Sequence, residues 1–307
     1  MATVTKEKID VYQIVTNRII EHLEKGVIPW RRTWANVGLA RNYVSGNTYR
    51  GINALLLNIT GHFVPCFLTI RQVNRLGGKV KKGSKGEQVI YYNKRFKDQN
   101  GKVIDEEAAG KMNKDDVTIQ SFARYYYVFN VADVEGVRFT FPNFELMPNE
   151  CLEQCEKLII SIPDKPEFIQ ENATDCYYSG KRDIINLPPI EHFESSENYY
   201  NVLFHELIHS TGHKNRLNRD SFTGSVRFGD TLGSEEEVIA ELGAAFLSCM
   251  TGIDYEPIVE NSASYIQGWL KRLREDKKFI FTASSRAQQA VDYLTKNYTS
   301  SITHPTA

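Results

Sequence analysis

The chain has 307 residues, of which 41% are hydrophobic, so it is long enough to bury the cores of two domains. It contains no run of 18 apolar residues, and its first ten residues are polar and lack the apolar stretch of a signal peptide. We therefore expect a cytoplasmic protein with no membrane partner. The five cysteines show no CxxC spacing, so we expect reduced thiols instead of a disulfide framework.

The formal net charge of −1 conceals two halves of opposite sign. Residues 1–130 hold 21 Lys and Arg against 11 Asp and Glu, whereas residues 131–307 hold 16 against 27. The excess is largest in residues 26–97, where 13 basic residues accompany a single acid, Glu87. A segment with so one-sided a charge is expected to attract a polyanion.

The N-terminal half is predicted to mix helices with strands. Apolar residues at helical spacing predict three helices, at residues 11–25, 51–59 and 69–76. Runs of β-branched and aromatic residues predict strands at residues 88–92 and 123–131. The segment between them, residues 97–120, is polar without periodicity, and we expect an exposed loop there.

Aromatic residues are interleaved with the basic residues of this half. Unpaired bases can stack on such rings while Arg and Lys follow the phosphates, which favours single-stranded nucleic acid. Core packing explains any one ring equally well, and only the assembled patch indicates nucleic acid. The residues predicted to contact DNA are Trp30, Arg31, Arg32, Trp34, Arg41, Tyr43, Tyr49, Arg50, Lys81, Lys82, Lys85, Tyr91, Tyr92, Lys94 and Arg95.

The second half is predicted to be mainly helical after a proline-containing linker. Helices are expected at residues 150–160, 234–246, 262–276 and 284–296, followed by a loose tail. A hairpin is expected at residues 175–188. Its second strand, residues 183–187, is our candidate for pairing with an extended substrate.

An HELIH run occupies residues 205–209 in an apolar stretch that is predicted to be a helix ending at Gly212. The spacing of four residues places the imidazoles of His205 and His209 on one helical face, where both can bind one Zn²⁺. Glu206 then lies beside the open coordination position. This pattern favours a zinc hydrolase over a core helix that carries two ordinary histidines.

The third metal ligand is expected from a second helix. The metzincin pattern would place a histidine at position 215, which is Asn215 here, so that class is disfavoured. Glu237 and Glu241 lie one helical turn apart. The gluzincin pattern makes Glu237 the third ligand and Glu241 a carboxylate that orients a ligand histidine, although the two roles could be exchanged.

The chemistry expected of this site is peptide hydrolysis. Zinc-bound water would attack a peptide carbonyl with Glu206 as the general base, and Mn²⁺ or another divalent ion could replace Zn²⁺. Tyr265 is a candidate donor to the oxyanion, although core packing also accounts for it. Glu235 and Glu236 are expected only to stabilise the N-terminus of a helix that is capped by Ser234.

Motifs in both halves carry a family resemblance. The first half resembles the N-terminal domain of ArdC-type antirestriction proteins in GVIPW (residues 26–30), YRGIN (49–53), KGSKG (82–86) and VFNV (128–131). The second half, from the HELIH run to Phe246, is similar to the zincin-like metallopeptidase domain of that family. The first domain also resembles that of plasmid-encoded primase-like proteins.

The resemblance implies an α+β protein of two domains. A domain that binds single-stranded DNA would cover residues 1–140, a linker residues 141–149, and a gluzincin-type zincin-like metallopeptidase domain residues 150–307. It also implies a role on a mobile element, where incoming DNA is protected from restriction. The partners would then be single-stranded DNA and a protein substrate such as a restriction component.

Three functions remain open at this point. The first is a zinc metallopeptidase that binds single-stranded DNA and cleaves a protein near it. The second is a protein that shields DNA by occupancy alone, with a structural zinc domain. The third, a nuclease, is disfavoured because metal-dependent nucleases generally use carboxylate-rich sites with two metals. Glu206 separates the first two, since a structural zinc site needs no general base.

Overall fold

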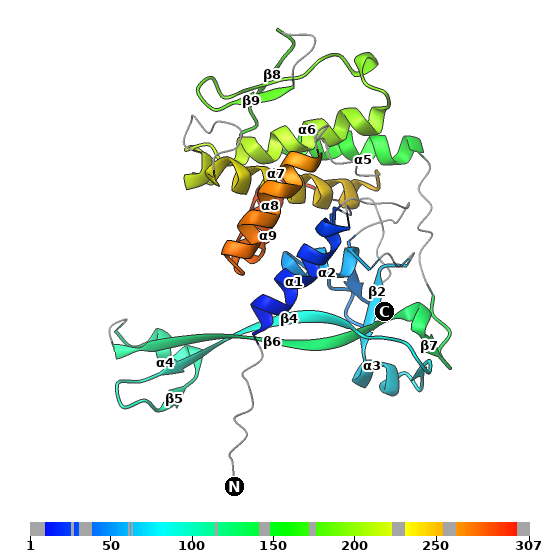
Figure 1. The fold of residues 1–307 in the computed structure, drawn as a ribbon, viewed down its shortest axis with the longest axis vertical. Helices are drawn as coiled ribbons and strands as arrows, with labels where there is room; N and C mark the ends of the chain where they lie inside the picture. Colours follow the sequence, from blue (N-terminus) through cyan, green and yellow to red (C-terminus); the bar gives the residue numbers. More distant parts are fainter. Residues whose placement is uncertain are drawn as a thin grey trace.

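The computed structural model combines a β-rich N-terminal part with a mainly helical C-terminal part, which confirms the α+β class (Figure 1). It describes residues 10–25, 28–30, 39–60, 62, 64–113, 116–140, 148–171, 176–222, 231–253 and 262–299. The predicted linker lies almost wholly outside these residues.

A five-stranded sheet with the order β1-β2-β6-β4-β5 forms the frame of the N-terminal part. Its strands are β1 (Arg41–Asn42), β2 (Cys66–Thr69), β4 (Glu87–Lys97), β5 (Val103–Ile104) and β6 (Thr118–Asn130). β4 and β6 pair antiparallel along the whole of β4 and form a long ribbon (Figure 1). A second, small sheet joins β3 (Lys79–Val80) to β7 (Val134–Glu135).

The prediction of a loop over residues 97–120 is wrong. β4 extends to Lys97 and β6 begins at Thr118, so both strands run beyond their predicted ends. Between them lie β5 and the short helix α4 (Glu106–Gly110), whose first turn is capped by Asp105 through a 2.7 Å bond from the Ala108 N–H. The ends of the ribbon are largely exposed, so no alternation of apolar and polar residues marked these strands.

The three helices predicted for this part are present as α1 (Val11–Glu24), α2 (Ile52–Asn58) and α3 (Ile70–Arg75). Asn53 of α2 fixes its helix to the ribbon. The side-chain amide of Asn53 donates to the Ile90 carbonyl at 2.7 Å and accepts from the Ile90 N–H at 2.6 Å. One asparagine therefore satisfies both outward backbone groups of a β4 residue, as a neighbouring strand would.

A three-stranded sheet with the order β8-β10-β9 precedes the metal-motif helix. Its strands are β8 (Glu167–Ile169), β9 (Tyr177–Ser179) and β10 (Ile184–Asn186). The antiparallel pairing of β9 with β10 confirms the hairpin. The prediction that residues 183–187 pair with a substrate is wrong, because β10 is the central strand and both its edges are already paired.

The helices of the C-terminal part are α5 (Pro148–Ser161), α6 (Ser196–Thr211), α7 (Thr231–Thr251), α8 (Ser262–Glu275) and α9 (Phe279–Leu294). Short 3-10 turns occur at Val131–Asp133, Ile190–His192 and Asp220–Phe222. α7 begins at Thr231, so Glu235 and Glu236 lie beyond its first turn, contrary to prediction. Within the described part of the chain, no helix is long and apolar enough to cross a membrane.

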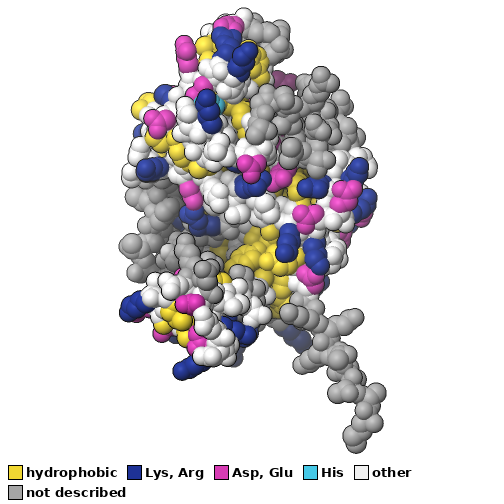
Figure 2. Space-filling view, turned by 90° about the vertical axis from the view of Figure 1, so that its left-hand side faces the viewer, with side chains coloured by type: hydrophobic (Ala, Val, Ile, Leu, Met, Phe, Trp, Pro, Cys, Tyr) yellow, Lys and Arg dark blue, Asp and Glu magenta, His cyan; other side chains and the backbone are white. Residues whose placement is uncertain are grey.

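The two parts share one hydrophobic core. α1 packs against the C-terminal helices, where Tyr12 contacts Phe281 of α9 edge to face with ring centroids 4.8 Å apart. The Thr16 hydroxyl donates to the Lys277 carbonyl at 2.8 Å. Figure 2 shows hydrophobic side chains gathered between the β-rich part and the helices. The DNA-binding domain predicted from sequence is therefore anchored directly on the predicted peptidase domain.

Candidate metal centre

α6 and α7 lie close together because Gly243 has no side chain. A Cβ added to Gly243 would lie 2.6 Å from Cδ1 and 2.7 Å from Cγ1 of Ile208, closer than such atoms approach. This contact brings the histidine-bearing face of α6 against the acidic face of α7. Gly212 ends α6 as predicted, and it also allows a close approach, since a Cβ there would lie 2.8 Å from Cβ of Phe222.

Three side-chain groups converge at this helix contact. The Nε2 atoms of His205 and His209 are 3.0 Å apart, and the two carboxylate oxygens of Glu237 lie 3.5 Å and 3.6 Å from them. Ligand atoms about 2 Å from a tetrahedral Zn²⁺ would be about 3.3 Å apart, so these spacings suit one ion. Among the described residues, these three form the group of His, Cys, Asp and Glu side chains close enough to share a metal.

Both histidines have a carboxylate near the ring nitrogen that faces away from Glu237. Nδ1 of His205 lies 3.6 Å from Glu241, whose side chain is fully buried. Nδ1 of His209 lies 3.4 Å from Glu236. A carboxylate at Nδ1 favours the tautomer whose Nε2 lone pair is available to a metal. Glu241 therefore lies beside a candidate ligand histidine, and its orienting role stays a prediction.

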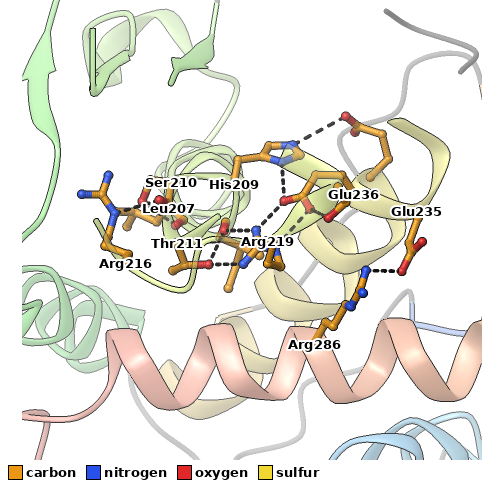
Figure 3. Close-up of polar contacts among 12 residues, drawn as sticks. Leu207, His209, Ser210, Thr211, Arg216, Arg219, Glu235, Glu236 and Arg286 are labelled. Carbon is orange, nitrogen blue, oxygen red and sulfur yellow. Dashed lines mark hydrogen bonds and ion pairs between the residues drawn. The ribbon is translucent and has the colours of Figure 1, made fainter. Parts of the chain in front are cut away.

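The sequence prediction for Glu236 is wrong, because this residue is not a helix-capping acid. Its carboxylate is buried, accepts two bonds from the Arg219 guanidinium and one from the Ser221 hydroxyl at 2.6 Å, and faces His209 (Figure 3). Arg219 also donates to the Thr211 hydroxyl and to the Ile208 carbonyl of α6. The pair therefore ties α6 to α7 behind the metal site.

No sequence signal indicated Arg219, which lies in the loop between the two helices. Glu236 had no such signal either, because neighbouring residues on a helix point in different directions and its position next to Glu237 does not place it at the site. Glu235, by contrast, pairs with Arg286 of α9 at 2.6 Å at the edge of the site (Figure 3).

The electrostatics of the site favour a bound cation. Burial lowers the pKa of His205, but the hydrogen bond to Glu237 and the charges of Glu237, Glu241 and Glu206 outweigh it and raise the pKa to about 9. Burial raises the pKa of Glu236, but His209 and Arg219 outweigh it and lower the pKa to about 2. A cluster of carboxylates this deeply buried requires positive charge among them, which a proton or a metal ion can supply.

Glu206 is 8% exposed on α6, between the two histidines. Its neighbours in the chain, Leu207 and Ile208, point into the core and are fully buried. Glu206 is thus carried by a buried stretch of α6, and its charge is among the causes that raise the pKa of His205. Tyr265 falls in α8, but its side chain lies outside the described residues.

Among the residues that the structure describes, those predicted to contact DNA do not form one surface. Trp30 and Arg41 are buried, with 6% and 5% of their surface exposed. Trp30 packs edge to face against Trp269 of α8, with ring centroids 5.0 Å apart. Neither side chain can reach a base or a phosphate in this conformation. The structure therefore contradicts the prediction for these two residues.

Several other members of that set are engaged within the protein. The contacts are Tyr43 against Phe139, Tyr49 against Phe67, Tyr92 against Phe281, and an ion pair of Arg50 with Asp292. The exposed members are Lys81, Lys82, Lys85, Tyr91 and Arg95, together with Tyr92, whose other surface is open, and Arg50. Arg31, Arg32, Trp34 and the side chain of Lys94 lie outside the described residues.

Comparison with known proteins supports both halves of this description. The model of the zincin-like metallopeptidase family matches residues 155–286. The model of the N-terminal domain of the anti-restriction factor ArdC matches residues 9–129. The C-terminal part is therefore a zincin-like metallopeptidase domain that follows an ArdC-type N-terminal domain.

The same combination of domains occurs in solved structures. The metal-free crystal structure of the antirestriction protein ArdC from plasmid R388 is 32% identical, with a TM-score of 0.72, and the match covers 94% of this chain and 98% of that one. The Mn(II)-bound structure of that protein is 31% identical with a TM-score of 0.70. The chain belongs to the ArdC family of antirestriction proteins.

Two curated relatives add to this picture. The uncharacterized protein y4eC of Sinorhizobium fredii is 33% identical, over 93% of this chain and 91% of its own length. The DNA primase TraC of Escherichia coli is 30% identical over 92% of this chain, which spans only 20% of the length of that primase. The similarity to the primase extends through both parts of the chain.

Proposed function

We propose that this protein is a metal-dependent peptidase that binds single-stranded DNA and counters restriction on behalf of a mobile element. The observation that carries the proposal is the convergence of two Nε2 atoms and one carboxylate at 3.0 to 3.6 Å, with Glu206 on the same helix. We propose His205, His209 and Glu237 as the ligands of one Zn²⁺ or Mn²⁺. The Mn(II)-bound form of the R388 protein supports a divalent metal.

A divalent ion at this site would supply a Lewis acid and lower the pKa of a coordinated water. Glu206 would accept a proton from the water as its oxygen bonds to the peptide carbonyl carbon, and would deliver that proton to the amine nitrogen as the C–N bond breaks. Glu236 and Glu241 hold the histidine rings through Nδ1, so that both Nε2 atoms keep their direction through the reaction. A purely structural site would not require a buried acid at position 206.

The substrate strand is proposed to pair with β9 instead of β10. Among the described strands, β9 is an edge strand that pairs with β10. The Phe222 ring lies 5.3 Å from the Tyr178 ring of β9 and 6.4 Å from the His209 ring, so β9 borders the proposed metal site. An extended peptide added to the outer edge of β9 would run past the metal ligands.

The N-terminal part is proposed to bind single-stranded DNA. Its basic excess in residues 26–97 supports attraction of a polyanion. The match to the ArdC N-terminal domain and the similarity to a DNA primase support nucleic acid as that polyanion. The alternative function, protection of DNA by occupancy without proteolysis, shares this domain and differs only in the use of Glu206.

The two functions can be separated in cells. Unmethylated plasmid DNA would be transferred into a restricting host in the presence of the unsubstituted protein, of Glu206→Gln, or of Glu197→Gln, a matched change in the first turn of the same helix. We expect Glu206→Gln to abolish protection and Glu197→Gln to preserve it. Undiminished protection by Glu206→Gln, at equal protein level, would favour the occupancy function instead.

A further inference from the structure

The two faces of the β4–β6 ribbon have different surroundings. Residues directly opposite each other in an antiparallel pair share a face, and neighbours along a strand alternate between faces. One face contacts the helices, through Ile90 and Tyr125 in the shared core and Tyr92 against Phe281 of α9. The opposite face joins a small core with Leu57 and Phe67 at Val89 and Val128. We call it the outer face because Tyr91, Arg95, Arg124 and Tyr126 on it are exposed. Tyr91 and Tyr92 therefore point in opposite directions, although the sequence places them together.

The outer face carries rings and guanidinium groups from both strands. Beyond the buried Val89, the register pairs Tyr91 with Arg124 and Arg95 with Gln120, while Tyr126 lies opposite Val89. Tyr91 is 52% exposed and Tyr126 41% exposed, and both arginines are exposed. Along the face, Tyr126 thus comes first, Tyr91 and Arg124 come next as a cross-strand pair, and Arg95 lies two pairs further on.

The spacing on this face suits successive bases. Tyr91 and Tyr126 are diagonal neighbours across the two strands, about 7 to 8 Å apart. Each can take one base of an extended strand, while Arg124, directly across from Tyr91, is in reach of the adjoining phosphate. Planar guanidinium groups bind phosphate with two bonds and also stack on rings.

We propose that the outer face of the ribbon, built from Tyr91, Arg95, Arg124 and Tyr126, is the base-stacking surface for single-stranded DNA. This inference rests on the proposed DNA binding and assigns it to a particular surface. A duplex is the poorer ligand, because its bases are already stacked and only its phosphates could be reached. Arg124 and Tyr126 were not among the residues predicted from sequence, since they lie beyond the basic segment.

The position of this face has a consequence for the peptidase. In the view of Figure 1, α8 and α9 lie between the ribbon and α6. DNA bound to the outer face leaves the metal site open. The DNA then acts as a tether that concentrates the peptidase near proteins on the same strand, and it is not threaded through the catalytic site.

Equilibrium binding of a fluorescent oligo(dT) to the full-length protein tests the surface. Tyr91→Ala and Tyr126→Ala are each expected to weaken binding at least about fivefold, as loss of one base stack does. Tyr91→Phe is expected to bind normally because the ring remains. Arg124→Ala should lower the slope of log K against log salt by about 0.7 for one lost phosphate contact.

Tyr127→Ala is the matched control. Tyr127 follows Tyr126 in the same strand and is 48% exposed, but it lies on the other face, where Gln88 donates to its hydroxyl at 3.4 Å. We expect this variant to bind oligo(dT) normally, and all variants to unfold thermally like the unsubstituted protein. Equal losses in Tyr127→Ala and Tyr126→Ala, or none in Tyr91→Ala and Tyr126→Ala, would refute the surface while leaving DNA binding in place.

Two other results would overturn more than the assignment of this surface. If the unsubstituted protein does not bind oligo(dT) at all, the proposed function fails together with the surface. If it binds a single-stranded RNA of the same length more tightly than the DNA, single-stranded DNA is the wrong ligand.

Discussion

Removal of Arg219 is the sharpest structural perturbation of the proposed metal site. The side chains of Arg219 and Glu236 are 6% and 4% exposed, so solvent screens their ion pair little. Breaking a buried pair by removing one partner costs about 3 to 5 kcal/mol. The Ser221 hydroxyl would still donate to Glu236 at 2.6 Å. For Arg219→Met we therefore expect the free energy of unfolding to fall by about 3 kcal/mol, the lower end of this range.

A double variant separates stability from metal affinity. In Arg219→Met with Glu236→Leu no buried charge is left unpaired, and most of the lost stability should return, as it does when buried ion pairs are replaced by apolar groups. His209 would still lack a carboxylate at Nδ1. Loss of such a partner lowers metal affinity about 10- to 100-fold, and the double variant should show this loss.

Denaturant unfolding of the metal-free proteins and titration with Zn²⁺ measure the two quantities. Arg286→Met is the control, since it breaks a partly exposed pair with Glu235 on the same helix and should cost no more than about 1 kcal/mol. The reasoning is refuted if Arg219→Met is no less stable than this control. It is equally refuted if the double variant binds Zn²⁺ as tightly as the unsubstituted protein.

Three further changes test how the fold supports the two sites. Gly243→Ala should force α6 and α7 apart, lower the free energy of unfolding by about 1 to 3 kcal/mol and weaken Zn²⁺ binding. An unchanged Zn²⁺ affinity would contradict the claim that this helix contact positions the metal ligands. Trp30→Ala should cost about 3 to 5 kcal/mol through loss of packing on Trp269, while the folded fraction keeps its affinity for oligo(dT). Asn53→Ala leaves two β4 backbone groups without their partner and should cost about 1 to 3 kcal/mol, visible as faster hydrogen exchange in the middle of β4.

The candidate metal centre could be predicted from sequence because local helix geometry fixes most of it. Residues four apart on a helix share a face, so the pattern itself places His205 beside His209 and Glu237 beside Glu241. The buried support of the site could not be predicted in this way. Arg219 reaches Glu236 from a loop, and only the tertiary fold brings the two together.

The DNA-contacting residues were harder to predict because strand pairing decides which face each side chain occupies. Tyr91 and Tyr92 are equivalent in a count of aromatics, yet one is on the outer face and the other against Phe281. Trp30 looked like a stacking residue because basic residues follow it, whereas its ring completes the core between the two parts. Charge along the sequence indicated the ligand class, and the register of β4 with β6 indicates the surface.

The central claim is that the protein is a peptidase with Glu206 as its general base. The rate of proteolysis tests this claim most directly. Cleavage of restriction-system proteins would be followed with Zn²⁺ and single-stranded DNA present, for the unsubstituted protein and for Glu206→Gln, with Zn²⁺ binding by both verified. We expect the unsubstituted protein to cleave a component and Glu206→Gln to lose at least about 100-fold in rate. Equal rates for the two proteins would contradict the role assigned to Glu206.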